Sequence, residues 1–104
     1  MNSLIENFLD FVSYEKGLSK NTQLSYRNDL LKFSNYLTKK KILNLNSLNR
    51  NDIRNYLLKL KSDGLKPSSI SRHIVSIRKF FEYLLQEGLI SEDPSALIPV
   101  SYTH

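Results

Sequence analysis

The sequence predicts an all-α domain of four helices that pack as antiparallel or orthogonal neighbours. Apolar residues recur at helical spacing along most of the 104 residues. No segment shows the alternating pattern of a strand, and the links between the expected helices are short. A chain of this length with 40% hydrophobic residues supports one core and not two.

The first expected helix begins at Ser3 and ends near Gly17. Ser3 is placed as its N-cap, with Glu6 three residues later as a capping box requires. Its apolar stripe consists of Leu4, Ile5, Phe8, Leu9, Phe11 and Val12. The second helix follows Ser19 and runs to the lysines at 39–41. Its residues Tyr26, Leu30, Phe33 and Leu37 share one face.

Two further helices are expected in the second half of the chain. Asn49 is a suitable N-cap for the third helix, after a polar link at 44–49, and Gly64 is a suitable left-handed terminator. Pro67 suits the first turn of the fourth helix, which closes at Gly88. Its apolar stripe consists of Ile70, Ile74, Ile77, Phe81 and Leu84. Asp93-Pro94 is expected to open one short further helical turn.

Composition narrows the classes of partner. Lys and Arg number 15 against 10 acidic residues, which gives a net charge of +5 and favours an anionic partner without naming it. The absence of cysteine excludes disulfides and thiolate metal sites, and two histidines are too few for a structural zinc centre. No segment approaches the roughly 20 apolar residues that span a bilayer. We therefore expect a cytoplasmic protein without cofactor, metal or membrane partner.

The side of the fourth helix that faces away from its apolar stripe is polar and basic. Its residues fall within a sector about 100° wide, and every charged residue between Leu65 and Phe81 is basic. Small hydroxyl side chains permit close approach to a DNA groove, and Arg or Lys reaches phosphates or guanine. A solvated helix face, with Ser68 as a simple cap, is the alternative interpretation. The candidate contacts are Lys66, Ser68, Ser69, Arg72, Ser76 and Lys79.

The second helix repeats this pattern opposite its own apolar stripe. Asn21, Ser25, Asn28 and Lys32 share that polar face. The first turn also offers backbone N–H groups and the positive end of the helix dipole to a phosphate. An ordinary cap made by Ser19 is the alternative, and it is the more common meaning of such a sequence taken alone. The candidate contacts are Lys20, Asn21, Thr22, Ser25 and Asn28.

No catalytic constellation is apparent. The acidic residues fall at expected helix ends or loops, where capping and solvation account for them. His73 borders the apolar stripe of the fourth helix and is expected to be packed or half-exposed. The tyrosines at 14, 26, 36, 56 and 83 are expected in the core or at its rim, and Tyr102 lies in the tail. The sequence therefore predicts a binding domain and not an enzyme.

Two segments resemble the N-terminal core-binding domain of tyrosine recombinases, in the Xer and phage-integrase branch. They read GLSKNTQLSYRNDLLKFSNYL at 17–37 and SSISRHIVSIRKFFEYLLQEGLISEDPSALI at 68–98. The resemblance covers about residues 3 to 98. The elements that carry it are Ser19, Asn21-Thr22, Tyr26, Asp29-Leu30, Phe33, Leu37, Arg72, Ser76, Arg78, Phe80 and Asp93-Pro94-Ser95.

The resemblance implies a four-helix SAM-like fold that forms one half of a clamp around duplex DNA. In the family the second and fourth helices cross the major groove. The corresponding positions here are Asn21, Thr22, Ser25, Asn28, Ser68, Ser69, Arg72 and Ser76. The resemblance further implies tetramers on paired DNA sites, in which neighbouring recombinase subunits touch, partly through the first helix.

The resemblance also implies that catalysis belongs to a domain outside this chain. The strand-cleaving tyrosine and its helpers lie in the family's C-terminal domain, and the step from His73 to Ser76 does not match the family's His-x-x-Arg element. We expect residues 1–98 to form the DNA-binding domain and 99–104 to be a truncated linker or a non-native tail.

Two functions are compatible with these observations. The first is DNA binding within a site-specific recombinase, which serves DNA integration or the resolution of chromosome dimers. The alternative is a helical protein–protein interaction module with a basic surface.

Overall fold

Four α-helices and one short 3-10 helix make up the computed structural model, which describes residues 2–42 and 44–96, without the side chain of Lys16. The helices are α1 (Asn2–Lys16), α2 (Lys20–Lys39), α3 (Arg50–Ser62) and α4 (Pro67–Gln86), with η1 (Leu45–Ser47) between α2 and α3. The described part of the chain contains no strand. The predicted all-α class is therefore confirmed.

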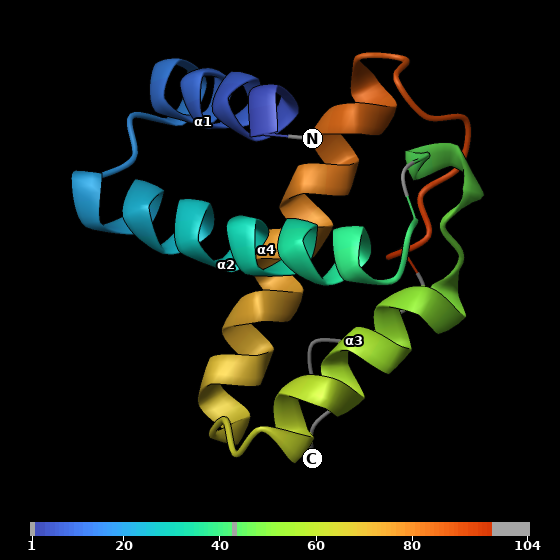
Figure 1. Cartoon of the computed structure of the whole chain (residues 1–104). Helices are drawn as coiled ribbons and strands as arrows, with labels where there is room; N and C mark the ends of the chain where they lie inside the picture. Colours follow the sequence, from blue (N-terminus) through green and yellow to red (C-terminus); the bar gives the residue numbers. More distant parts are fainter. Residues whose placement is uncertain (1, 43, 97–104) are drawn as a thin grey trace.

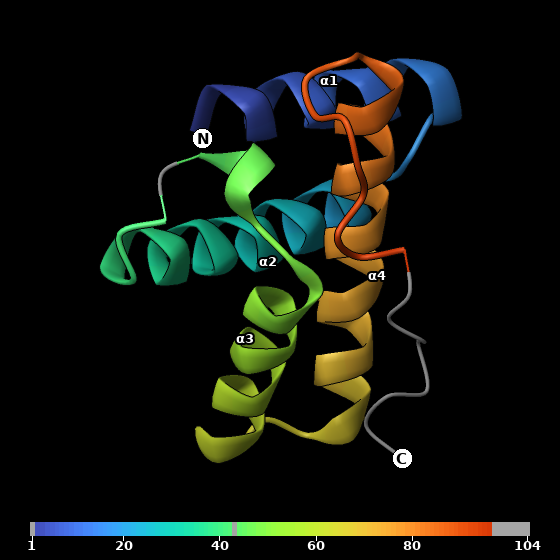
Figure 2. The same cartoon turned by 90° about the vertical axis from the view of Figure 1, so that its right-hand side faces the viewer.

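The helices form two antiparallel pairs that lie crosswise. Figures 1 and 2 show α1 beside α2 and α3 beside α4, with α2 passing across α4 at a steep angle. Residues after α4 turn back along it, and Ser91 N–H donates to the Asn46 side chain beside η1 (3.3 Å). Within residues 2–42 and 44–96, no helix combines the length and the apolar composition that a membrane span requires.

The core lies where the two pairs cross. All four helices contribute fully buried side chains, among them Phe8, Phe33, Tyr56 and Phe81. The Phe33 ring packs edge-on against Tyr56 at 5.0 Å and against Phe81 at 6.1 Å between centroids. Edge-to-face pairs of this kind stabilise a core beyond the area that they bury. The apolar stripes predicted for the four helices thus meet in a single core.

The helix boundaries follow from local hydrogen bonding. Ser19 caps α2 by accepting from Thr22 N–H, and Asn49 forms a capping box with Asp52 at the start of α3. Gly64 adopts a φ of +91° beyond α3, and Leu65 N–H reaches back to the Leu60 carbonyl (3.2 Å). This is the left-handed ending that glycine permits.

Three local expectations need correction. Ser3 is not the N-cap of α1, because the helix already includes Asn2, and Glu6 instead pairs with Arg27 (2.9 Å). The link at 44–49 contains η1, which begins where the Asn44 side chain accepts from Asn46 N–H. Tyr14 is 88% exposed and belongs neither to the core nor to its rim.

The end of the described chain agrees with the sequence in part. Asp93 opens a single hydrogen-bonded turn, in which its side chain accepts from the N–H and hydroxyl of Ser95 (2.8 and 2.6 Å). This turn does not extend into a helix within the described residues. The expected end of the domain at 98, the tail at 99–104 and Tyr102 lie outside the residues that the structure describes.

Replacing Phe81 by Ala is expected to lower the free energy of unfolding by about 3–5 kcal/mol, the usual cost of removing a large ring from a packed core. Phe81 is fully buried, whereas Leu58 on α3 is 48% exposed. Leu58→Ala is the matched control and should cost well under half as much. Urea unfolding followed by circular dichroism measures both, and equal losses would contradict the assigned core.

Candidate nucleic-acid interface

The polar face of α2 reaches solvent over most of its length. Lys20, Asn21 and Asn28 are exposed, and Thr22 and Ser25 are half-buried. The Ser19 hydroxyl accepts a hydrogen bond from Thr22 N–H (3.3 Å), so Ser19 is an ordinary N-cap of α2, as the alternative interpretation of this turn expected. The accessible side chains of this face are short amides and hydroxyls, with Lys20 and Lys32 as its cations.

The polar face of α4 is exposed at four of its candidate positions. Lys66, Ser68, Arg72 and Lys79 are exposed, and Ser69 is half-buried. Ser68 does not cap the helix: Lys66 is the N-cap residue, it makes no side-chain cap, and Pro67 begins the helix. In the first turn of α4, Ser68 is therefore left exposed to solvent.

Ser76 is not part of this exposed face. It is fully buried, and its hydroxyl donates to Asp29 Oδ2 at 2.7 Å. The helical pattern placed Ser76 at the edge of the polar sector, and α2 crosses α4 at that edge. The prediction that Ser76 lies on the exposed DNA-facing side of α4 is therefore wrong.

A buried carboxylate joins the two polar faces. Asp29 on α2 is 1% exposed, and Arg72 on α4 donates to both of its oxygens, from Nε (3.2 Å) and from Nη2 (2.9 Å). With the Ser76 bond, three donors from α4 converge on one carboxylate. Burying such a charge is costly unless it is paired and hydrogen-bonded, as it is here. The Arg72 side chain itself is 52% exposed.

His73 and Tyr56 complete this cluster on its inner side. His73 Nε2 lies 3.4 Å from Asp29 Oδ1, and the Tyr56 hydroxyl lies 3.5 Å from His73 Nδ1. Burial lowers the pKa of His73 from its ordinary value, against the opposing attraction of Asp29. Burial also raises the pKa of Tyr56, so both rings are neutral at physiological pH. Both side chains are thus packed in the interior as hydrogen-bonding partners.

Lys32 adds a positive charge near the buried cluster. It is exposed on α2, and its charge contributes to the lowered pKa values of both His73 on α4 and Asp63 at the end of α3. Lys32 therefore lies near the crossing of α2 and α4. We define the interface surface as Lys20, Asn21, Thr22, Ser25, Asn28 and Lys32 of α2 with Lys66, Ser68, Ser69, Arg72 and Lys79 of α4.

The sequence pattern did not reveal Asp29 as the link between these faces. It was visible only as one element of the family resemblance, because its partners lie 43 and 47 residues further along the chain. The only local signal was that Asp29 comes directly before Leu30, a residue of the apolar stripe. That position does not indicate which residues of another helix pair with Asp29.

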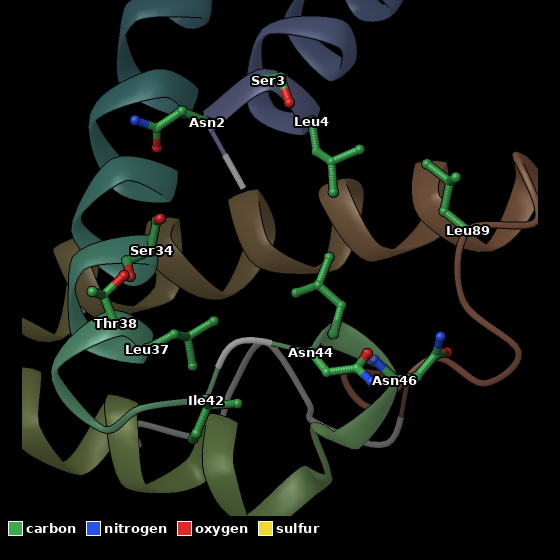
Figure 3. Close-up of a pocket in the computed structure, with 11 residues that line it drawn as sticks. Asn2, Ser3, Leu4, Ser34, Leu37, Thr38, Ile42, Asn44, Asn46 and Leu89 are labelled. Carbon is green, nitrogen blue, oxygen red and sulfur yellow. Dashed lines mark hydrogen bonds between the residues drawn. The ribbon is translucent and has the colours of Figure 1, made fainter.

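Acidic residues elsewhere in the described part of the chain have structural roles. Asp52 serves as a cap and Asp63 pairs with Lys59 (2.9 Å), which lowers the pKa of Asp63. The described residues contain no cluster of acidic or histidine side chains able to hold a metal. A hollow between the start of α1, the end of α2 and η1 is lined by amide, hydroxyl and aliphatic side chains, none of them charged (Figure 3).

Two antiparallel helical pairs that cross at one core define a helical domain of the SAM-like class. The family model for the phage integrase N-terminal SAM-like domain matches residues 5–88, and the chain belongs to this family.

Three relatives illustrate the similarity, each bearing the name tyrosine recombinase XerD. The chain is 42% identical over 95 residues to the one from Listeria innocua, 39% over 98 to that from Staphylococcus haemolyticus and 41% over 92 to that from Oceanobacillus iheyensis. These alignments cover 90%, 94% and 88% of this chain but only 32%, 33% and 31% of the relatives. The chain thus spans about a third of their length.

Lowering the pH from about 7.5 to about 5.5, where histidine is the side chain that titrates, is expected to destabilise the domain. Because the pKa of His73 is lowered on folding from 6.5, the unfolded chain binds more protons in this range. The contribution of neutral His73 to the free energy of unfolding is fully present above pH 6.5 and is lost as the pH falls below that value. Urea midpoints across this range measure the effect, and His73→Gln should flatten the profile. A wild-type midpoint that rises on acidification would contradict the neutral, buried assignment.

Proposed function

We propose that this domain binds duplex DNA through the interface surface, as the N-terminal, DNA-holding part of a site-specific tyrosine recombinase. The observation that carries the proposal is the Asp29–Arg72 pair. It brings the polar faces of two crossing helices together at one place, although they lie far apart in the sequence. The family membership and the names of the relatives support the same function.

The charges of the interface surface suit a phosphate backbone. Its cations are Lys20, Lys32, Lys66, Arg72 and Lys79, and its remaining members are hydroxyl or amide side chains. Three acids near this surface have basic partners. Asp29 is buried against Arg72, and Glu82 lies 3.9 Å from Lys79. Asp63, which also feels the charge of Lys32, pairs with Lys59 at 2.9 Å. Lysine and arginine bind phosphates, while short polar side chains allow helices to approach a groove.

The finer assignments belong to the same proposal. In the whole recombinase this domain would form half of a clamp whose other half is the catalytic domain, and neighbouring subunits would touch in a tetramer on paired sites. The reaction served would be DNA integration or the resolution of chromosome dimers in the cytoplasm. In this arrangement the present chain positions DNA and does not cleave it.

Binding to DNA is expected to weaken steeply with salt. Each phosphate contact contributes about −0.9 to the slope of log K against log salt concentration. Three to five contacts then predict a loss of about 40- to 500-fold between about 50 and 200 mM salt. Fluorescence anisotropy with a labelled duplex of about 30 base pairs, roughly three turns, measures this loss. Affinity that changes less than about threefold would favour the protein-interaction alternative.

Lys66→Ala is expected to reduce the magnitude of that slope by about 0.9, the share of one phosphate contact. Lys66 is exposed at the start of α4 within the interface surface. Arg54→Ala removes the same charge from an exposed position on α3, outside that surface, and is the matched control. Equal changes in slope for the two variants would show that binding follows net charge and not this surface.

A further inference from the structure

The bidentate contact between Asp29 and Arg72 fixes the direction of an exposed charge. Arg72 uses Nε and Nη2, which lie along one edge of the planar guanidinium, to grip both carboxylate oxygens. An arginine carries five N–H donors, so the Nη1 pair and one Nη2 hydrogen are left for other partners. Because the group is planar, holding one edge sets the orientation of the other.

Asp29 is itself held rigidly. Its carboxylate is 1% exposed and accepts the Ser76 hydroxyl at 2.7 Å, with His73 Nε2 at 3.4 Å on the other oxygen. No buried side-chain N or O atom in the described part of the chain lacks a hydrogen-bond partner. The carboxylate is therefore a fixed support, whereas an ordinary exposed acid moves together with its arginine.

Arg27 provides an internal contrast. Its Nη2 also donates to a carboxylate, that of Glu6, at 2.9 Å. Both of these side chains are about half exposed. Exposed ion pairs of this kind restrict side chains little. Arg72 differs from Arg27 because its carboxylate partner, Asp29, is buried.

We infer that Asp29 is a positioning residue for DNA binding: it holds the Arg72 guanidinium in the orientation that meets DNA before DNA arrives. This inference rests on the proposed function. Ordering a flexible side chain during binding costs affinity, and a side chain that is already ordered avoids that cost. Asp29 itself contacts no DNA in this role, since it is buried beneath Arg72.

A double-mutant cycle in DNA affinity tests the inference. The variants are Asp29→Asn, Arg72→Ala and the double variant, each measured with the labelled duplex at low salt and at a temperature where circular dichroism shows it folded. Loss of the negative charge of Asp29 by itself favours DNA binding, whether or not Arg72 is present. The positioning effect of Asp29, however, requires Arg72. The ratio of the change in affinity caused by Asp29→Asn with Arg72 present to the change with Arg72 absent therefore isolates the positioning effect.

We expect Asp29→Asn to be less favourable in the presence of Arg72 than in its absence, by about 2- to 12-fold, the range given by the cost of immobilising one side chain. Asp63→Asn makes the same charge change at the end of α3 and is the matched control, with equal effects in both backgrounds. Equal effects for Asp29→Asn would overturn the inference.

A measurement on the wild-type domain decides the case even if a variant fails to fold. Exchange of the Arg72 Nε–H with water, followed by NMR, should be at least several-fold slower than that of Arg27, whose Nε is not the atom that pairs with Glu6. Equal exchange rates would overturn the positioning role. Loss of salt-dependent DNA binding by the wild-type domain would instead refute the proposed function, while the NMR comparison would still report on Arg72.

Discussion

The buried carboxylate of Asp29 is the constraint on which the arrangement of the domain depends. A charged group without solvent must find donors, and here they come from Arg72 and Ser76, more than 40 residues away on α4. Hydrophobic packing alone is tolerant of small shifts between helices. A carboxylate with directed hydrogen bonds is not, so this contact fixes where α2 crosses α4. We interpret it as a source of specificity in the fold more than of net stability.

The same contact links the core to the surface. One side of the cluster is apolar and aromatic, where the Tyr56 ring packs edge-on against Phe33 and borders His73. The other side is open, where the Arg72 side chain emerges beside the polar residues of α2. A single group therefore serves packing inside and orientation outside. Substitutions that loosen the crossing are accordingly expected to disturb the surface as well as the core.

The helices are predictable from the sequence because periodicity, caps and terminators are local. Asn49, Gly64 and Pro67 each act at a helix end as expected. Contacts between distant helices were less accessible. Ser76 was wrongly placed on the open face, since angular position on one helix does not reveal where a polar partner helix crosses it. Asp29 was missed as a partner for the same reason, and η1 because it is a short element held by one local cap.

Three of the ten acids of the chain, Glu6, Asp10 and Glu15, lie exposed on α1, and Glu6 pairs there with Arg27 of α2. Exposed acids repel a polyanion, just as exposed lysines attract it. If the domain binds DNA as proposed, this repulsion opposes the approach of α1 to the duplex, while the interface surface favours its own approach. Salt screens both effects, so the rate of productive encounter would depend on ionic strength, as affinity does.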